Sequence, residues 1–236
     1  MGFLNTIKNI TLNTIFPVKC LSCGVSGYDL CINCLGDFPN ASRETVNWIF
    51  PVYDYRHPPI KKALWLLKYK GKKRLANIFA EILYDKIVEE LADLVIMENF
   101  NNIILIPIPL SGKRLRERGY NQAELICREL IKINNLTPSP SPYQGEGCRR
   151  RGEVLTLQNN ILIKPKETEH QARIENRRQR LQNIIGSFSL KNSELVKNRN
   201  IILIDDIITT GATLNEARKV LKQAGARKII AFTIAH

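Results

Sequence analysis

The clearest chemistry in the sequence lies in residues 202–214, which read ILIDDIITTGATL. Aliphatic residues typical of a buried strand lead into two adjacent carboxylates, Asp205 and Asp206, and an apolar pattern with helical spacing begins at Leu214. The loop between the acidic pair and this helical pattern includes Thr209, Thr210, Gly211, Ala212 and Thr213. A helix start offers free backbone N–H groups at the positive end of its dipole, which favours a bound anion. Because carboxylates accept hydrogen bonds from vicinal hydroxyls, the stretch predicts a site for a ligand with a phosphate and a ribose diol.

An ordinary turn between a strand and a helix, capped by Thr213, is the competing interpretation of this stretch. Such a cap does not need two carboxylates at the end of the strand, so we favour the ligand site. Other phosphate-binding loops do not fit. The sequence contains no Gly-Lys-Ser or Gly-Lys-Thr, and Gly145 and Gly147 follow a Pro/Ser-rich segment rather than a strand.

Four cysteines near the N-terminus form a second candidate site. Cys20 and Cys23 are one Cys-x2-Cys pair, and Cys31 and Cys34 are another, seven residues further on. This spacing predicts a closed tetrahedral zinc site with a structural role. Disulfides are disfavoured in the cytoplasm, and a redox Cys-x-x-Cys pair normally occurs singly at a helix start, so both alternatives are weaker.

Composition and charge limit the class of protein. The chain has 236 residues, 44% of them hydrophobic and 24% charged, which is typical of a soluble globular protein with one ordinary domain and an appendage. No apolar run is long enough to span a membrane. Residues 1–18 form an amphipathic segment without the continuous apolar stretch of a signal peptide, so we expect a cytoplasmic protein.

The net charge of +13 is concentrated in four stretches, 54–74, 113–118, 149–151 and 173–180. They hold 19 of the 35 basic residues and only 3 of the 22 acidic ones, so their partners should be anions. A phosphate-rich ligand accounts for part of this excess, and nucleic acid is a candidate for the rest. The competing interpretation is that about half of these residues are solvated helix faces.

Alternating strand and helix patterns predict a parallel α/β sheet flanked by helices. We expect strands at 48–55, 103–106, 161–163, 184–190, 202–204 and 229–234, and helices around 60–67, 75–91, 119–133 and 213–224. Ligands of such sheets bind at the carboxyl ends of the strands, where the loop after Asp206 would lie.

Two boundaries divide the chain. Residues 1–45 are expected to hold the amphipathic segment and the zinc module, and residues 46–236 the α/β domain. Within the domain, residues 135–152 are rich in Pro, Gly and Arg and cannot form an amphipathic element, so they predict a flexible low-complexity insertion.

Several motifs together resemble a known family. The stretch from Asp205 to Thr213 is similar to the phosphoribosyl-pyrophosphate (PRPP) motif of type I phosphoribosyltransferases. With the four cysteines and the segments PIPL (107–110), RGYNQ (118–122) and TxxQ (168–171), the chain resembles the ComF family of competence-associated phosphoribosyltransferase-like proteins. It departs from many relatives by lacking a further set of paired cysteines, and by its 135–152 insertion.

The resemblance implies a reaction in which pyrophosphate is displaced from C1 of PRPP. Asp205 and Asp206 would hold the ribose hydroxyls, residues 209–213 the 5′-phosphate, and Mg²⁺ would bridge diol and pyrophosphate. Arg114 and Arg118, in the loop after the first core strand, would bind the pyrophosphate, because guanidinium groups match phosphate oxygens. The competing interpretation of both arginines is a solvated helix start. Three further arginines are expected to close over the site or contact DNA: Arg177, Arg178 and Arg180.

Two functions follow as hypotheses. The first is a PRPP- and Mg²⁺-dependent transferase whose acceptor stays open, since no residue stands out as a general base. The second is a non-catalytic competence factor that binds single-stranded DNA and the DNA-uptake machinery, with the PRPP loop as a regulatory or nucleotide-phosphate site. Trp65, Tyr69 and Tyr120 could stack bases, although Trp65 is equally expected to pack inward. The sequence does not define the oligomeric state.

Overall fold

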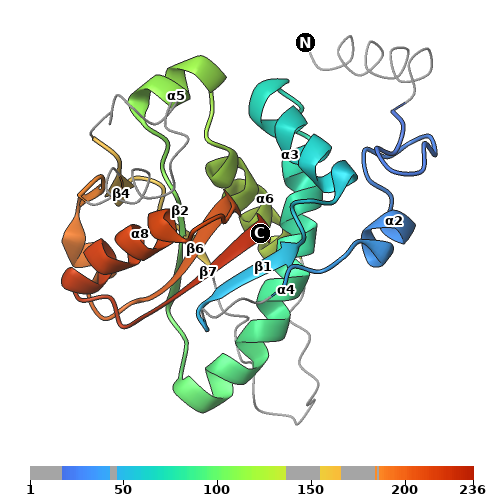
Figure 1. The fold of residues 1–236 in the computed structure, drawn as a ribbon. Coiled ribbons are helices and arrows are strands. Elements are labelled where there is room, and N and C mark those ends of the chain that lie inside the picture. The colour runs from blue at the N-terminus through green and yellow to red at the C-terminus, as the bar shows by residue number, and fades with distance from the viewer. Residues whose placement is uncertain (1–17, 43–46, 137–154, 166–183, 185) are drawn as a thin grey trace, which may run out of the picture.

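The computed structural model describes residues 18–42, 47–136, 155–165, 184 and 186–236 (Figure 1). Residues 1–17, most of the 135–152 insertion, the TxxQ segment and the three arginines expected over the site lie outside the described residues.

The centre of the fold is a five-stranded sheet in which every pairing is parallel, in the order β1-β7-β6-β2-β3. The strands are β1 (Ile49–Tyr53), β2 (Ile103–Pro107), β3 (Thr156–Leu157), β6 (Asn200–Ile207) and β7 (Lys228–Ala235). The predicted parallel α/β sheet is confirmed. Pro51 is compatible with β1 because this strand lies at the edge of the sheet.

Helices cover both faces of the sheet, which is why its strands are aliphatic almost throughout (Figure 1). One face packs against α3 (Pro58–Tyr69), α4 (Leu75–Glu98) and α6 (Gln122–Leu136). The other packs against α8 (Ala212–Gln223) and the antiparallel pair β4 (Leu162–Ile163) and β5 (Ser189–Leu190). Side chains alternate along β6, so Ile202 and Ile204 contact the first group while Ile201 and Leu203 contact the second.

The structure differs from the predicted elements between β2 and α6. Residues Gly112–Arg118 form a separate helix, α5, which ends because Gly119 adopts a left-handed backbone conformation (φ 75°). Asn121 then links the start of α6 to the end of β2: its side chain accepts a hydrogen bond from the Ala123 N–H and donates one to the Ile108 carbonyl. The predicted helix over 119–133 therefore begins at Gln122, and it continues to Leu136, past the expected start of the insertion.

The strand expected over 184–190 is much shorter in the structure. Only Ser189 and Leu190 pair, with Ile163 and Leu162, and the short strand β3 was not expected. After β5, a 3-10 helix, η1 (Ser193–Val196), leads to β6. Phe188, from the apolar pattern that predicted this strand, packs in the hydrophobic cluster on the α8 side of the sheet.

The cysteine-containing segment packs on the edge of the sheet domain through the short helix α2 (Ile32–Asp37). Leu30 and Phe38 belong to the same hydrophobic cluster as Tyr53 of β1. The Tyr53 hydroxyl also donates a 3.2 Å hydrogen bond to the Leu35 carbonyl. In the part of the chain that the structure describes, no helix is both long and apolar enough to cross a membrane.

Candidate functional site

The acidic pair lies inside strand β6 rather than after it. Asp205 pairs with Thr233 of β7, and Ile207 pairs with Ala235, so the strand continues three residues beyond the aliphatic run that predicted it. The Asp205 carboxylate accepts a 2.9 Å hydrogen bond from the Asp206 N–H. Both carboxylates are thus held at the carboxyl end of the central strand, with little freedom in their backbone.

Strand alternation sends the two carboxylates to opposite faces of the sheet. Asp206 lies on the α3 side, where its Oδ1 is 2.9 Å from the Lys68 ammonium, and both side chains are largely buried. Asp205 lies on the side of β4, where Lys164 is close enough to interact with it electrostatically. Each acid therefore has a lysine on its own face.

The loop after β6 leads into α8 through Gly211, which is the N-cap residue and has a φ of 72°. A Cβ at this position would lie 3.4 Å from Asn215 Nδ2 and 3.6 Å from Ile208 Cδ1, so the loop is tightly built as well as left-handed. Thr210 Oγ1 accepts a 3.4 Å hydrogen bond from the Ala212 N–H at the start of α8, and within the described residues Thr213 does not cap the helix. The competing interpretation, a turn capped by Thr213, is therefore not what the structure contains, and the other N–H groups of the first turn remain for a ligand.

A cavity of about 710 Å³ at this edge of the sheet brings the sequence-predicted residues together. It is lined by Asp205, Asp206, Thr209, Thr210, Gly211, Ala212, Thr213, Arg114 and Arg118. The lining also includes Lys68, Tyr69, Ser111, Tyr120 and Lys164, none of which the sequence analysis assigned to the phosphate site. The sequence had pointed to Tyr69 and Tyr120 only as aromatic residues that could stack bases, and to Lys68 only as part of the basic stretch 54–74.

Arg114 and Arg118 lie on α5 and not in a loop as expected, because Ser111 caps this helix by accepting a hydrogen bond from the Arg114 N–H. The Arg118 guanidinium is fixed by three contacts. It donates to Gln122 Oε1 (3.0 Å) and to the Tyr69 hydroxyl (3.3 Å), and it lies over the Tyr69 ring at 5.0 Å. One end of the cavity therefore presents a preoriented cation, the Arg118 guanidinium.

The charges in the cavity perturb one another. Burial, followed by the charge of Asp206, raises the pKa of Asp205 to about 7. Burial, followed by repulsion from Arg114, lowers the pKa of Lys164. A multiply charged ligand with both phosphate and hydroxyl groups would oppose both pKa shifts, because its phosphates lie near the cations and its hydroxyls donate hydrogen bonds to the carboxylates.

Tyr69 and Trp65 form an exposed aromatic pair on α3, with ring centroids 6.3 Å apart and 59% and 46% of their surfaces accessible. The Lys70 ammonium lies 5.2 Å from the centre of the Trp65 ring. Trp65 therefore points outward, and the inward-packing alternative is wrong. Tyr120 is used differently: its hydroxyl donates to the Leu67 carbonyl, and Lys73 covers its ring.

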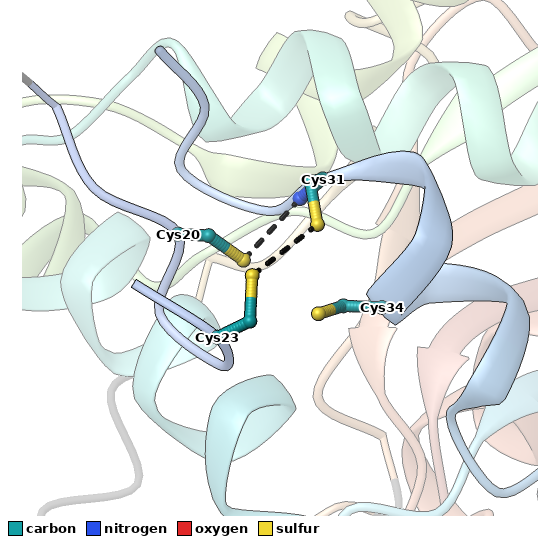
Figure 2. Close-up of side chains that lie close together, drawn as sticks. All are labelled: Cys20, Cys23, Cys31 and Cys34. Carbon is teal, nitrogen blue, oxygen red and sulfur yellow. Dashed lines mark hydrogen bonds between the residues drawn. The ribbon is translucent and has the colours of Figure 1, made fainter. Parts of the chain in front are cut away.

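The four paired cysteines converge on one point, as Figure 2 shows. Their sulfur atoms all lie within 4.8 Å of one another, and this group can hold a metal ion such as zinc. The Cys31 N–H donates to Cys20 Sγ (3.4 Å). Burial raises the pKa of Cys20, but hydrogen bonds from the backbone of Cys23, Ser22 and Cys31 outweigh it and lower the pKa to about 6, which favours a thiolate ligand.

Comparison with known proteins agrees with this architecture. A family model described as the phosphoribosyl transferase domain matches residues 158–236, which include β6, the loop and α8. The sheet, its loop and this match define a phosphoribosyltransferase-type domain. A hypoxanthine phosphoribosyltransferase from Staphylococcus aureus aligns with a TM-score of 0.34 and 12% identity over 68% of this chain and 62% of its own. That likeness is too weak to add to the assignment.

Relatives narrow the class to a family. The competence protein ComFC of Bacillus subtilis (strain 168) is 32% identical over 184 residues, which cover 78% of this chain and 62% of the relative. Competence protein F of Haemophilus influenzae is 35% identical over 56% of this chain and 49% of its own length. The DNA utilization protein YhgH of Salmonella typhi is 24% identical over 89% of this chain and 80% of its own. The chain thus spans about half to two thirds of the first two relatives. It belongs to the ComF family of phosphoribosyltransferase-like proteins.

Proposed function

We propose that the cavity binds PRPP with Mg²⁺ and that the protein displaces pyrophosphate from its C1 atom in favour of an acceptor. One observation carries the proposal: two strand-borne carboxylates, an N–H-rich hydroxyl loop and two arginines line a single cavity. These are the groups that a phosphate, a ribose diol and a pyrophosphate need, and they lie at the strand ends where α/β proteins bind ligands.

The proposed roles follow from the chemistry of each group. Asp205 and Asp206 accept hydrogen bonds from the ribose hydroxyls, and residues 209–213 donate to the 5′-phosphate from the start of α8. Arg114 and Arg118 bind the pyrophosphate, each charge-assisted hydrogen bond contributing roughly 1.5–3 kcal/mol. The carboxylate oxygens suit a hard cation, and Mg²⁺ bound with the substrate would neutralise pyrophosphate charge.

In the proposed reaction the C1–O bond to pyrophosphate breaks and the leaving group takes its electron pair. A lone pair of the acceptor forms the new bond to C1. The arginines stabilise the charge that develops on the leaving group, and the rigid β6 carboxylates hold the ribose while C1 becomes electron-poor.

We further propose that the cysteine cluster holds one structural Zn²⁺ and that the protein works in the cytoplasm. Five cysteines in the described residues are free, including the four of the cluster, which fits a reducing compartment. Tetrahedral zinc is the usual ion of a closed four-thiolate site.

The central experiment is calorimetry with PRPP and Mg²⁺. The wild type should bind, and the double variant Asp205→Asn, Asp206→Asn should show no heat of binding. Asp93→Asn, at an exposed position on α4, controls for loss of one charge. Equal binding by the wild type and the double variant would contradict the assignment of the PRPP site to Asp205 and Asp206. Release of pyrophosphate across a panel of nucleobase and nucleic-acid acceptors then separates turnover from binding alone.

A second candidate function, binding of single-stranded DNA, is favoured by the exposed Trp65–Tyr69 pair beside Lys70 and Arg118. Aromatic rings next to cations are the usual platform for stacked bases. Tyr69 and Arg118 also line the cavity, so a strand bound there would meet PRPP. Competition between PRPP and an oligonucleotide is expected if both occupy this rim, and independent binding would separate the two functions.

A further inference from the structure

Lys68 lies in the last turn of α3, and its ammonium lies where that helix meets the end of β6. The apolar face of α3 is anchored in the core by Ile60, Ala63, Leu64 and Leu67, all of which are at most 1% exposed. This anchoring fixes the backbone from which the Lys68 side chain extends. The side chain is 17% exposed, and its Nζ lies 2.9 Å from Asp206 Oδ1 in the cavity lining.

The Lys68–Asp206 pair differs from an ordinary surface ion pair, which contributes little to the free energy of folding. The Asp206 side chain is 12% exposed and the Lys68 side chain 17%, so their contact is largely shielded from solvent. The two residues extend from α3 and β6, whose apolar side chains are both packed in the core, so the pair holds the Asp206 carboxylate at a fixed place in the cavity lining.

The ion pair lies where a ligand would meet the acids. Lys68 and Asp206 both line the cavity, and in the part of the chain that the structure describes Asp206 is the carboxylate within ion-pair distance of this ammonium. The contact therefore determines how the Asp206 carboxylate faces a ribose hydroxyl.

We propose that Lys68 is a positioning residue for diol recognition, holding the Asp206 carboxylate in place so that the site prefers a pentose with both ring hydroxyls. This inference rests on the proposed function, because it assigns Lys68 to the ribose side of the PRPP site. It predicts that Lys68 acts through Asp206 on sugar discrimination, and not on phosphate affinity.

The test uses four probes with calorimetry: ribose 5-phosphate, 2-deoxyribose 5-phosphate, 3-deoxyribose 5-phosphate and inorganic phosphate. The wild type should prefer ribose 5-phosphate over at least one deoxy sugar. In Lys68→Met this preference should fall about tenfold or more, as expected for loss of a charge-assisted hydrogen bond, while phosphate affinity stays within twofold. Lys68→Arg should recover part of the preference. Lys61→Met removes the same charge from an exposed position two turns earlier on α3 and should behave as wild type.

A double-mutant cycle shows whether Lys68 acts through Asp206. Once Asp206→Asn is present, adding Lys68→Met should change the preference much less than it does in the wild type, the remainder reflecting the charge of Lys68 on Asp205. A uniform loss of affinity for all four probes, or an unchanged preference in Lys68→Met, would overturn the inference while leaving PRPP binding intact. If Lys68→Met is unstable by thermal unfolding, Lys68→Gln replaces it. Failure of the wild type to bind PRPP or any sugar phosphate would instead remove the proposed function, and this inference with it.

Discussion

The buried carboxylate of Asp29, between the two cysteine pairs, accepts a 3.0 Å hydrogen bond from the Arg74 guanidinium just before α4. Lys72 donates to the same oxygen at 3.3 Å, and Asp29 is only 3% exposed. Gly71, adjacent to Lys72, lines the cavity. The α3–α4 turn is therefore shared: one side is tied to the cysteine-containing segment, and the other forms part of the candidate site.

Replacing Asp29 by Asn should lower the free energy of unfolding by about 1–3 kcal/mol, because two cations lose the charge of a buried partner. Urea denaturation measures this change. Glu129→Gln, which removes the partner of the more exposed Lys132, should cost less than about 0.5 kcal/mol. An equal effect of the two substitutions would mean that the Asp29 pair is not a structural tie.

Metal removal should destabilise the cysteine-containing segment. We expect one zinc per chain by elemental analysis, and its loss in Cys20→Ser together with a lower melting temperature, because metal binding contributes directly to folding. Cys127→Ala should keep the zinc, since Cys127 is a fully buried core residue on α6. Zinc retained at full stoichiometry without Cys20 would contradict the four-cysteine assignment.

Stability without ligand should depend on pH through Asp205. Its folded-state pKa of about 7 exceeds the ordinary value of 3.8, so the folded state binds this proton more tightly than the unfolded state. The corresponding stability is fully present below about pH 4 and is lost as the pH rises to about 7. The free energy of unfolding of Asp205→Asn minus that of the wild type should therefore be higher at pH 8 than at pH 4.5, by on the order of a few kcal/mol. Unfolding at both pH values tests this, with the exposed Asp93→Asn expected to show no such trend.

Gly211→Ala should weaken phosphate binding more than it weakens the fold. The substitution strains a left-handed residue by roughly 1 kcal/mol and moves a loop packed against Asn215. Gly225→Ala is the matched control, with a φ of 89° and a Cβ that would lie 3.5 Å from Lys197 Cγ, remote from the cavity lining. Both variants should lose similar stability, and only Gly211→Ala should lose affinity for ribose 5-phosphate. A similar loss of affinity in both would contradict a role for this loop in phosphate binding.

Trp65→Ala should reduce affinity for single-stranded DNA by about 1–3 kcal/mol if the aromatic pair stacks bases. Fluorescence anisotropy at several salt concentrations measures both the affinity and its steep electrostatic dependence. Tyr28→Ala removes an even more exposed aromatic residue from the cysteine-containing segment and should have little effect. If Trp65→Ala binds as tightly as wild type, the aromatic pair is not the DNA platform.

The sequence was sufficient for the sheet, because aliphatic runs such as 103–106 and 229–234 can hardly be placed elsewhere than in buried strands. It also identified the acids, the loop and both arginines that line the cavity. It missed Lys68 because nothing local distinguishes a lysine on a solvated helix face from one that meets a carboxylate 138 positions away. It missed Lys164 because this residue follows a two-residue strand and approaches Asp205 only through the fold. It misplaced the arginines because α5 has only seven residues, too few to show a helical apolar pattern.

The opposite orientations of Asp205 and Asp206 have a consequence for natural variation. Asp206 contacts Lys68 directly, whereas the charges of both Lys68 and Lys164 act on Asp205. Position 206 should therefore covary with position 68 on α3, while position 205 should depend on both lysines. An alignment of ComF-family sequences should show a strong link between positions 68 and 206, and weaker links of position 205 to positions 68 and 164.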